Sequence, residues 1–132
     1  YNNVAAIYIG ANPLLQNING LQNISFEGDR AAISISGNEF ITNLDALSQI
    51  SGELESLQIH GMPNLQSTSG LSQITAVTAH FFVSDINETS LLSGFQNISS
   101  ISGEMILSFN DGFTNLDIFS NTEIFRKIYN FM

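Results

Sequence analysis

The chain contains no cysteine and only three cationic side chains in 132 residues, and both shortages restrict its function. Without cysteine the protein has no disulfide framework, no thiol nucleophile and no cysteine-ligated metal. Twelve acidic side chains against three basic ones give a formal net charge of −9, so the surface repels nucleic-acid phosphates and anionic lipid head groups. Apolar runs also stay well below the roughly 18 residues that a transmembrane helix needs. We therefore expect no nucleic-acid partner and no membrane insertion.

Uncharged polar residues make up much of the chain instead. Only 11% of the residues are charged, whereas Asn, Ser, Gln, Thr and Gly are plentiful. This hydroxyl- and amide-rich profile is more typical of secreted surfaces than of cytosolic enzymes, so we expect an extracellular or cell-surface location. The chain begins with Tyr1 and carries no signal peptide, which predicts a processed or excised segment.

A seven-residue phrase occurs four times, with an apolar third residue, an amide at its fifth position and an isoleucine at its sixth. The copies are NGLQNIS at 19–25, DALSQIS at 45–51, SGLSQIT at 69–75 and SGFQNIS at 93–99. We take the third residue of the phrase as the anchor of a repeat, and a fifth anchor continues the spacing. The anchors of repeats 1 to 5 are Leu21, Leu47, Leu71, Phe95 and Phe119, separated by 26, 24, 24 and 24 residues. A fixed period of this length is typical of solenoid proteins.

Two sets of apolar positions share the period. Positions 14 and 12 before each anchor (−14 and −12) are alternating apolar sites, as in AIYIG, ISISG and LQIHG, which predicts a β-strand with one buried face. These pairs are Ile7 and Ile9, Ile33 and Ile35, Leu57 and Ile59, Phe81 and Val83, and Met105 and Leu107. Positions −6, −3, 0 and +3 advance in steps of three, which suits tight extended or 3₁₀-like backbone on the opposite side. One repeat buries too little to fold alone, so we expect five stacked coils of about 24 residues over residues 1–119.

An amide stands two residues after the anchor in every repeat. The five amides are Asn23, Gln49, Gln73, Asn97 and Asn121. Amides stacked at strand spacing bond one another along the stack, as in cross-β ladders, so we predict a structural amide ladder.

The strand segments resemble the leucine-rich-repeat signature L-x-x-L-x-L-x-x-N. Asn12, Asn38 and Asn110 occupy its asparagine position, whose side chain bonds backbone in the turn, whereas Met62 and Ile86 depart from it. The G-L-x-x-I-x-G-x-L joints resemble the receptor L domain, a relative of leucine-rich repeats found in receptor ectodomains and in microbial surface proteins. The resemblance implies a right-handed parallel β-helix of the microbial surface type, and it says little about a ligand.

The two ends of the stack differ in sequence. Segment 120–132 begins with a capping-box pattern, Ser120 to Glu123, and we predict that it is a short C-terminal helical cap of the same domain. The first repeat has no such cap and should expose a strand edge, which invites pairing with another chain. The apolar residues expected to mediate end-to-end assembly are Ile7, Ile9, Leu14, Ile124 and Ile128, with Leu15 and Ile18 beside the first three.

Few residues suggest chemistry. His60 and His80 lie in different repeats, and the carboxylates are scattered without a general acid/base pair, so we expect no catalytic site and no cofactor. A calcium candidate comprises Asp85, Asn110 and Asp111, without a known calcium-loop signature. Three sequons are possible glycosylation sites: Asn23, Asn87 and Asn97.

A contact surface is the more informative feature. Position −13 lies between the two buried strand positions and should face outward, and it is occupied by Tyr8, Ser34, Gln58, Phe82 and Ile106. Tyr8, Phe82 and Ile106 form a candidate ligand or partner surface. We therefore expect a non-catalytic extracellular domain that binds a protein or glycan, or adheres, through this face. The alternative is a structural subunit that stacks on copies of itself into a filament or surface layer.

The assigned register predicts the effect of a charge at a central anchor. Leu71→Asp should unfold the protein, because it buries an unpaired carboxylate at a cost of several kcal/mol. Thermal melting followed by circular dichroism measures this. A variant that melts like the parent would show that Leu71 does not face the core.

Overall fold

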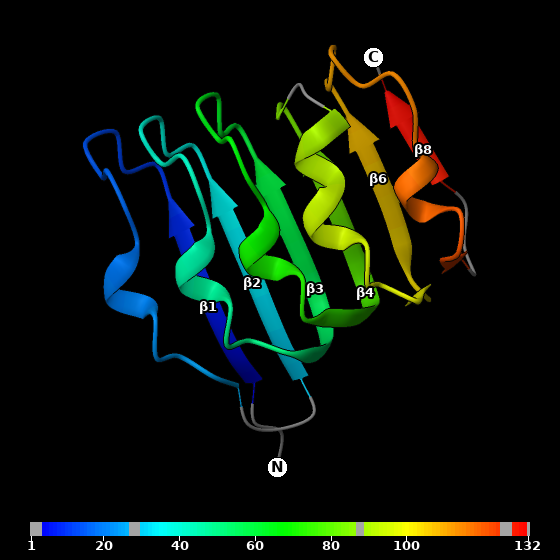
Figure 1. The fold of residues 1–132 in the computed structure, drawn as a ribbon, viewed down its shortest axis with the longest axis horizontal. Helices are drawn as coiled ribbons and strands as arrows, with labels where there is room; N and C mark the ends of the chain where they lie inside the picture. The colour runs from blue at the N-terminus through cyan, green and yellow to red at the C-terminus, as the bar shows by residue number, and fades with distance from the viewer. Residues whose placement is uncertain (1–3, 27–29, 87–88, 125–127, 132) are drawn as a thin grey trace.

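Parallel strands dominate the computed structural model, which describes residues 4–26, 30–86, 89–124 and 128–131 (Figure 1). The strands are β1 (Val4–Gly10), β2 (Arg30–Ser36), β3 (Gly52–His60), β4 (Ile74–Ser84), β5 (Ser100–Ile101), β6 (Glu104–Ser108), β7 (Glu123–Ile124) and β8 (Ile128–Phe131). They form one open sheet in the order β1-β2-β3-β4, after which β5 and β6 both pair with β4, β7 with β5, and β8 with β6. The predicted all-β parallel fold is confirmed at this level, and the sheet does not close on itself.

Short 3₁₀ helices stand at the anchors, as the three-residue steps predict. They are η1 (Asn19–Leu21), η2 (Asp45–Leu47), η3 (Ser69–Leu71), η4 (Thr89–Phe95) and η5 (Asp117–Phe119). Figure 1 shows them side by side over one face of the sheet, so each repeat is a strand, a turn, a 3₁₀ helix and a return to the next strand. The core lies between the helices and the inner face of the sheet.

The strands pair in the predicted register. Ile7 lies opposite Ile33, Ile33 opposite Leu57, and Phe81 opposite Met105. The inward strand positions −14 and −12 of repeats 2 to 5 are almost fully buried, as are the anchors Leu47, Leu71 and Phe95. Towards the C-terminal end the core becomes aromatic, because Phe81 packs edge-on against Phe95 and Phe119 with ring centroids 5.1 and 5.7 Å apart.

A side-chain oxygen four residues before the anchor starts most 3₁₀ helices. Asn17, Asn43, Ser67 and Asn115 each accept a hydrogen bond from the backbone N–H two residues later, at 3.0 to 3.1 Å. This bond satisfies a donor that has no partner within the helix. The column is visible in the sequence in four repeats of five.

The asparagines of the repeat signature tie neighbouring turns together. Asn38 is fully buried, and its amide donates to the Ile9 carbonyl at 3.0 Å while its oxygen accepts the Asn12 N–H at 3.2 Å. In repeat 5, Asn110 donates to the Val83 carbonyl and accepts the Ile86 N–H, both at 3.1 Å. In both clamps the asparagine side chain bonds one backbone N–H and one backbone carbonyl of the repeat before it.

Repeats 3 and 4 replace this asparagine by apolar residues. Met62 and Ile86 are buried there, and they extend the core towards the turn instead of forming the clamp.

The amide column at +2 differs from the prediction. Its members are exposed, and the two that bond do so to backbone: Gln73 donates to the Ser48 carbonyl at 2.8 Å and Asn97 to the Ser72 carbonyl at 2.6 Å. Among the described residues no amide of this column bonds another. Gln73 and Asn97 therefore reach one repeat back and bond a carbonyl at the end of the preceding 3₁₀ turn, where helix carbonyls lack an internal partner.

The predicted C-terminal helix is wrong where the structure describes residues 120–132. Ser120 ends the 3₁₀ turn by donating its N–H to Asp117, and Glu123 donates its N–H to the Ser99 carbonyl at 2.9 Å. β7 and β8 then add a sixth rung to the sheet. The free edge of β5 and β6 offers a row of backbone donors and acceptors, and Ile, Phe and Tyr suit a strand as well as a helix. Tertiary pairing thus overrides a helical pattern too short to be decisive.

Close approach between repeats requires glycine beside two anchors. A Cβ on Gly70 would lie 1.9 Å from the Leu44 carbonyl oxygen, and one on Gly94 would lie 1.9 Å from that of Thr68. The equivalent Gly20 in repeat 1 has nothing within 4 Å. The 3₁₀ helices therefore stack backbone to backbone where glycine is present.

Alanine substitution at this column tests the stacking. Gly70→Ala should lower the free energy of unfolding by about 1–3 kcal/mol, because the added methyl forces two backbones apart. Gly20→Ala is the matched control and should be neutral or stabilise by about 0.4–1 kcal/mol, because it only restricts the unfolded chain. Urea denaturation measures both. Equal effects at the two positions would contradict the close approach.

Candidate functional site

The outer face of the sheet carries the predicted contact column. Strand pairing places Tyr8 beside Ser34, Ser34 beside Gln58, Gln58 beside Phe82 and Phe82 beside Ile106. Tyr8 is 73% exposed, whereas Phe82 and Ile106 are half-buried. The column is therefore continuous across the face, with an exposed phenol at one end and an aromatic-aliphatic pair towards the other.

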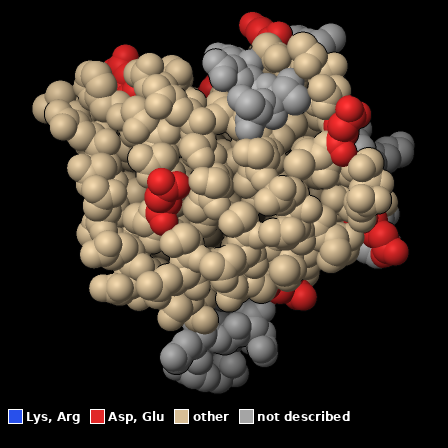
Figure 2. Space-filling model, in the orientation of Figure 1, with Lys and Arg blue, Asp and Glu red and all other residues tan. Residues whose placement is uncertain are grey.

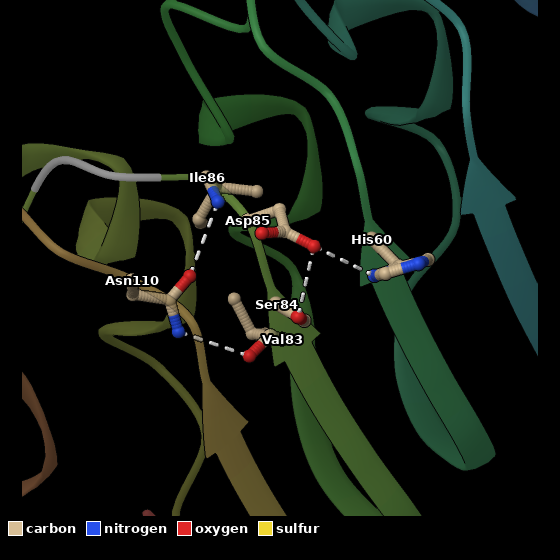
Figure 3. A network of polar contacts seen from close by, with 6 residues as sticks. All are labelled: His60, Val83, Ser84, Asp85, Ile86 and Asn110. Atoms are coloured by element: carbon tan, nitrogen blue, oxygen red, sulfur yellow. Dashed lines mark hydrogen bonds and ion pairs between the residues drawn. The ribbon is translucent and has the colours of Figure 1, made fainter. Parts of the chain in front are cut away.

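A polar network adjoins Phe82 at the ends of β3 and β4 (Figure 3). The His60 ring lies 5.8 Å from the Phe82 ring, and its Nδ1 is 3.4 Å from Asp85 Oδ2. Ser84, which is buried, places its hydroxyl 3.3 Å from the same carboxylate oxygen. Because both side chains of the pair are about half exposed, at 49% and 46%, this contact contributes little to stability and leaves polar groups facing solvent.

The order of these groups does not suit nucleophilic catalysis. In a Ser-His-Asp relay the imidazole lies between the hydroxyl and the carboxylate. Here the Asp85 carboxylate lies between Ser84 and His60, so the imidazole does not contact the hydroxyl (Figure 3). The arrangement presents a ring, an imidazole and a carboxylate side by side.

Left-handed backbone follows β1, β2, β3, β4 and β6. The residues ten before the anchors have φ between 53° and 62°: Ala11, Gly37, Gly61, Asp85 and Phe109. Glycine adopts this conformation freely and aspartate tolerates it, but a bulky side chain rarely does. Sequence reasoning missed this column, and the glycines of repeats 2 and 3 were its only signal.

Phe109 is the unexpected member of the site. It directly follows β6 and lies beside Asp85, whose N–H donates to the Ser108 carbonyl. It combines a φ of 55° with 55% exposure, so it is neither favoured by its backbone nor needed as a core residue. Strained residues on exposed turns are typical of functional sites. We define the carboxyl-end patch as His60, Phe82, Asp85, Ile106 and Phe109.

Two residues of the calcium candidate, Asp85 and Asn110, contact different partners. Asp85 contacts His60, while the Asn110 oxygen accepts the Ile86 N–H (Figure 3). Asp111 is exposed. Over the part of the chain that the structure describes, no three His, Asp or Glu side chains converge on a possible metal position.

The sequons differ in their surroundings. Asn23 and Asn97 belong to the exposed +2 column, and the Asn97 amide is bonded to the Ser72 carbonyl. The Asn23 side chain makes no hydrogen bond to any described residue. Asn87 lies outside the described residues.

The predicted assembly residues are not equally accessible. Ile7 and Ile18 are buried by their own neighbours, contrary to the exposed cluster expected for repeat 1, because the second repeat covers the inner side of β1. Ile9 is half-buried, whereas Leu14 is 82% exposed. At the other end Ile124 is half-buried in β7, and Ile128 begins β8 with its side chain outside the described part.

Comparisons with known proteins assign neither a family nor a function to the chain. No family model, curated protein sequence or solved structure matches the chain. Among the described residues, no helix has the length and hydropathy needed to cross a membrane.

Backbone strain at Phe109 predicts that removing its ring changes the free energy of unfolding very little. Phe109→Gly should leave the free energy of unfolding within about 0.5 kcal/mol, because relief of roughly 1–2 kcal/mol of left-handed strain offsets added backbone entropy and partial loss of ring burial. Ala11→Gly is the matched control with no ring to lose, and it should stabilise the protein by about 0.5–1 kcal/mol. Urea denaturation of both variants measures the difference. A large loss at Phe109 alone would make its ring a structural residue.

Proposed function

We propose that the chain is a non-catalytic extracellular surface domain that binds a protein or glycan ligand through the outer face of its sheet. In this proposal the fold is a right-handed parallel β-helix of the leucine-rich-repeat and L-domain kind. The observation that carries the proposal is the continuous column from Tyr8 to Ile106, which ends at the carboxyl-end patch. A solvent-facing phenol and a nearby aromatic patch have no role in the core, so contact with another molecule is the function they fit best.

The Asn38 and Asn110 clamps support the resemblance to leucine-rich repeats. Both side-chain oxygens accept a backbone N–H in the turn after a strand, from Asn12 and from Ile86, as expected of the signature asparagine. Binding by such a domain uses a rigid flat face, and the in-register strands supply it without any loop rearrangement.

The chemistry of the face indicates the kind of ligand. Phe82, Ile106 and Phe109 provide apolar contact, while His60 and Asp85 provide hydrogen-bond donors and acceptors beside them. The chain is strongly acidic, so a neutral or basic ligand meets less repulsion than an anionic one. Aromatic rings next to a carboxylate suit either a sugar ring or a basic peptide segment.

A pair of exposed residues on different surfaces tests the proposal. A ligand is first identified by screening the parent chain on glycan and protein arrays. Phe82→Ser should then weaken binding by at least about tenfold, because it removes a central aromatic contact. Leu14→Ser, which removes a more exposed apolar side chain away from the column, should leave the affinity unchanged. Equal affinity for all three proteins would place the ligand elsewhere, and no captured ligand would count against a binding function.

End-to-end assembly is the second candidate, because β1 is an open sheet edge and Leu14 beside it is highly exposed. The same two variants discriminate the candidates. Light scattering and negative-stain microscopy of an assembling chain should show fibres that Leu14→Ser weakens and Phe82→Ser does not. A monomer near 14.4 kDa at every concentration would reject assembly.

A further inference from the structure

A groove of about 290 Å³ opens between the 3₁₀ segments of repeats 1 and 2. It lies on the side of the molecule opposite the outer sheet face, so it is separate from the carboxyl-end patch. Its polar lining consists of Asn19, Gln22, Asn23, Asp45, Ser48 and Gln49, with the Ala46 methyl as the apolar part.

The groove exists where the glycine column is interrupted. Ala46 stands where repeats 3 and 4 have Gly70 and Gly94, and those glycines permit backbone contact with the repeat before. The groove therefore lies beside an alanine rather than a glycine.

Hydrogen bonding by the amide two residues after the anchor also differs between repeats with and without glycine just before the anchor. Where glycine is present, Gln73 and Asn97 bond a carbonyl of the preceding repeat. Repeats 2 and 5 carry Ala46 and Ile118 instead, and there Gln49 and Asn121 make no side-chain hydrogen bond to any described residue. In repeat 2 this leaves an unbonded amide on the wall of an open groove.

The lining selects the chemistry of an occupant. Four amides and one hydroxyl offer donors and acceptors in similar number, and Asp45 adds an acceptor. The groove has no cationic residue, so anions are disfavoured, and a single carboxylate is too few for calcium. The volume is at the lower end of small-ligand sites. Figure 2 shows the same side of the molecule as mostly uncharged surface with isolated acidic groups.

We propose that this groove binds a neutral saccharide unit, with the Gln49 amide and the Asp45 carboxylate bonding its hydroxyl groups. Hydroxyl groups donate and accept, so they match a wall of amides better than any apolar or charged ligand does. The saccharide has two sources, because Asn23 is itself a sequon residue: a free sugar, or the first unit of a glycan attached to Asn23.

A titration of the unglycosylated chain tests the free-sugar source. Methyl glycosides of glucose, mannose and galactose, and N-acetylglucosamine, are added up to tens of millimolar while ¹H–¹⁵N spectra are recorded. We expect saturable shifts at residues 19–23 and 45–49, including the Gln49 side-chain amide. Gln49→Ala should weaken the apparent Kd by roughly threefold to tenfold, because one hydrogen bond is lost.

Gln73→Ala is the matched control. Gln73 belongs to the same amide column but bonds the Ser48 carbonyl and does not line the groove, so its loss should leave the sugar affinity unchanged. Phe82→Ser should also leave it unchanged, so failure of this site and failure of the outer-face proposal are distinguishable. The backbone spectrum of each variant reports folding independently of binding.

A second arm tests the attached glycan. The chain produced in a eukaryotic secretory host is compared with its Asn23→Gln variant by mass spectrometry and the same spectra. An Asn23 glycan that shifts residues 45–49 supports the attached source, and shifts on titration support the free source. No shift at residues 45–49 in either arm overturns the proposal.

Discussion

Stacking of each repeat on the one before it is the constraint on which the rest of the structure depends. The hydrogen bonds that join repeats all require a residue to lie over its counterpart about 24 positions earlier, whether they come from strands, asparagine clamps or exposed amides. The period therefore belongs to the backbone as much as to the core. Glycine at 70 and 94 extends that contact to the 3₁₀ side, where a single methyl would exceed the available space.

The polar columns and the apolar columns contribute to folding in different ways. Buried Leu, Ile and Phe side chains supply non-directional stabilisation, which would tolerate small displacements between repeats. Asn38 and Asn110 do not tolerate them, because each satisfies a donor and an acceptor of the preceding turn at once. Register is thus specified by polar groups whose bonds fail if the chain slips, while the core provides most of the favourable free energy.

Periodicity predicted the features that recur and missed those that depend on a single position. The strand pairs, the 3₁₀ turns and the outward column from Tyr8 to Ile106 follow from the spacing of apolar residues, and the structure places them in that register. The C-terminal strands were missed because the edge of β5 and β6, not local propensity, determines the conformation of residues 123–124 and 128–131. Phe109 was missed because a left-handed φ cannot be recognised from the sequence when the residue is not glycine. Whether the amides bond each other or backbone also depends on distances that spacing alone does not give.

The gap beside Ala46 has a mechanical consequence for the first repeat. Asn38 holds repeat 1 at the turn edge, whereas the 3₁₀ side of the same junction lacks the Gln49 bond and encloses a groove. A junction fixed along one edge and open along the other bends more easily than it slides. Bending at this junction therefore strains fewer hydrogen bonds on the 3₁₀ side than bending at the next two junctions, where Gln73 and Asn97 each bond the repeat before.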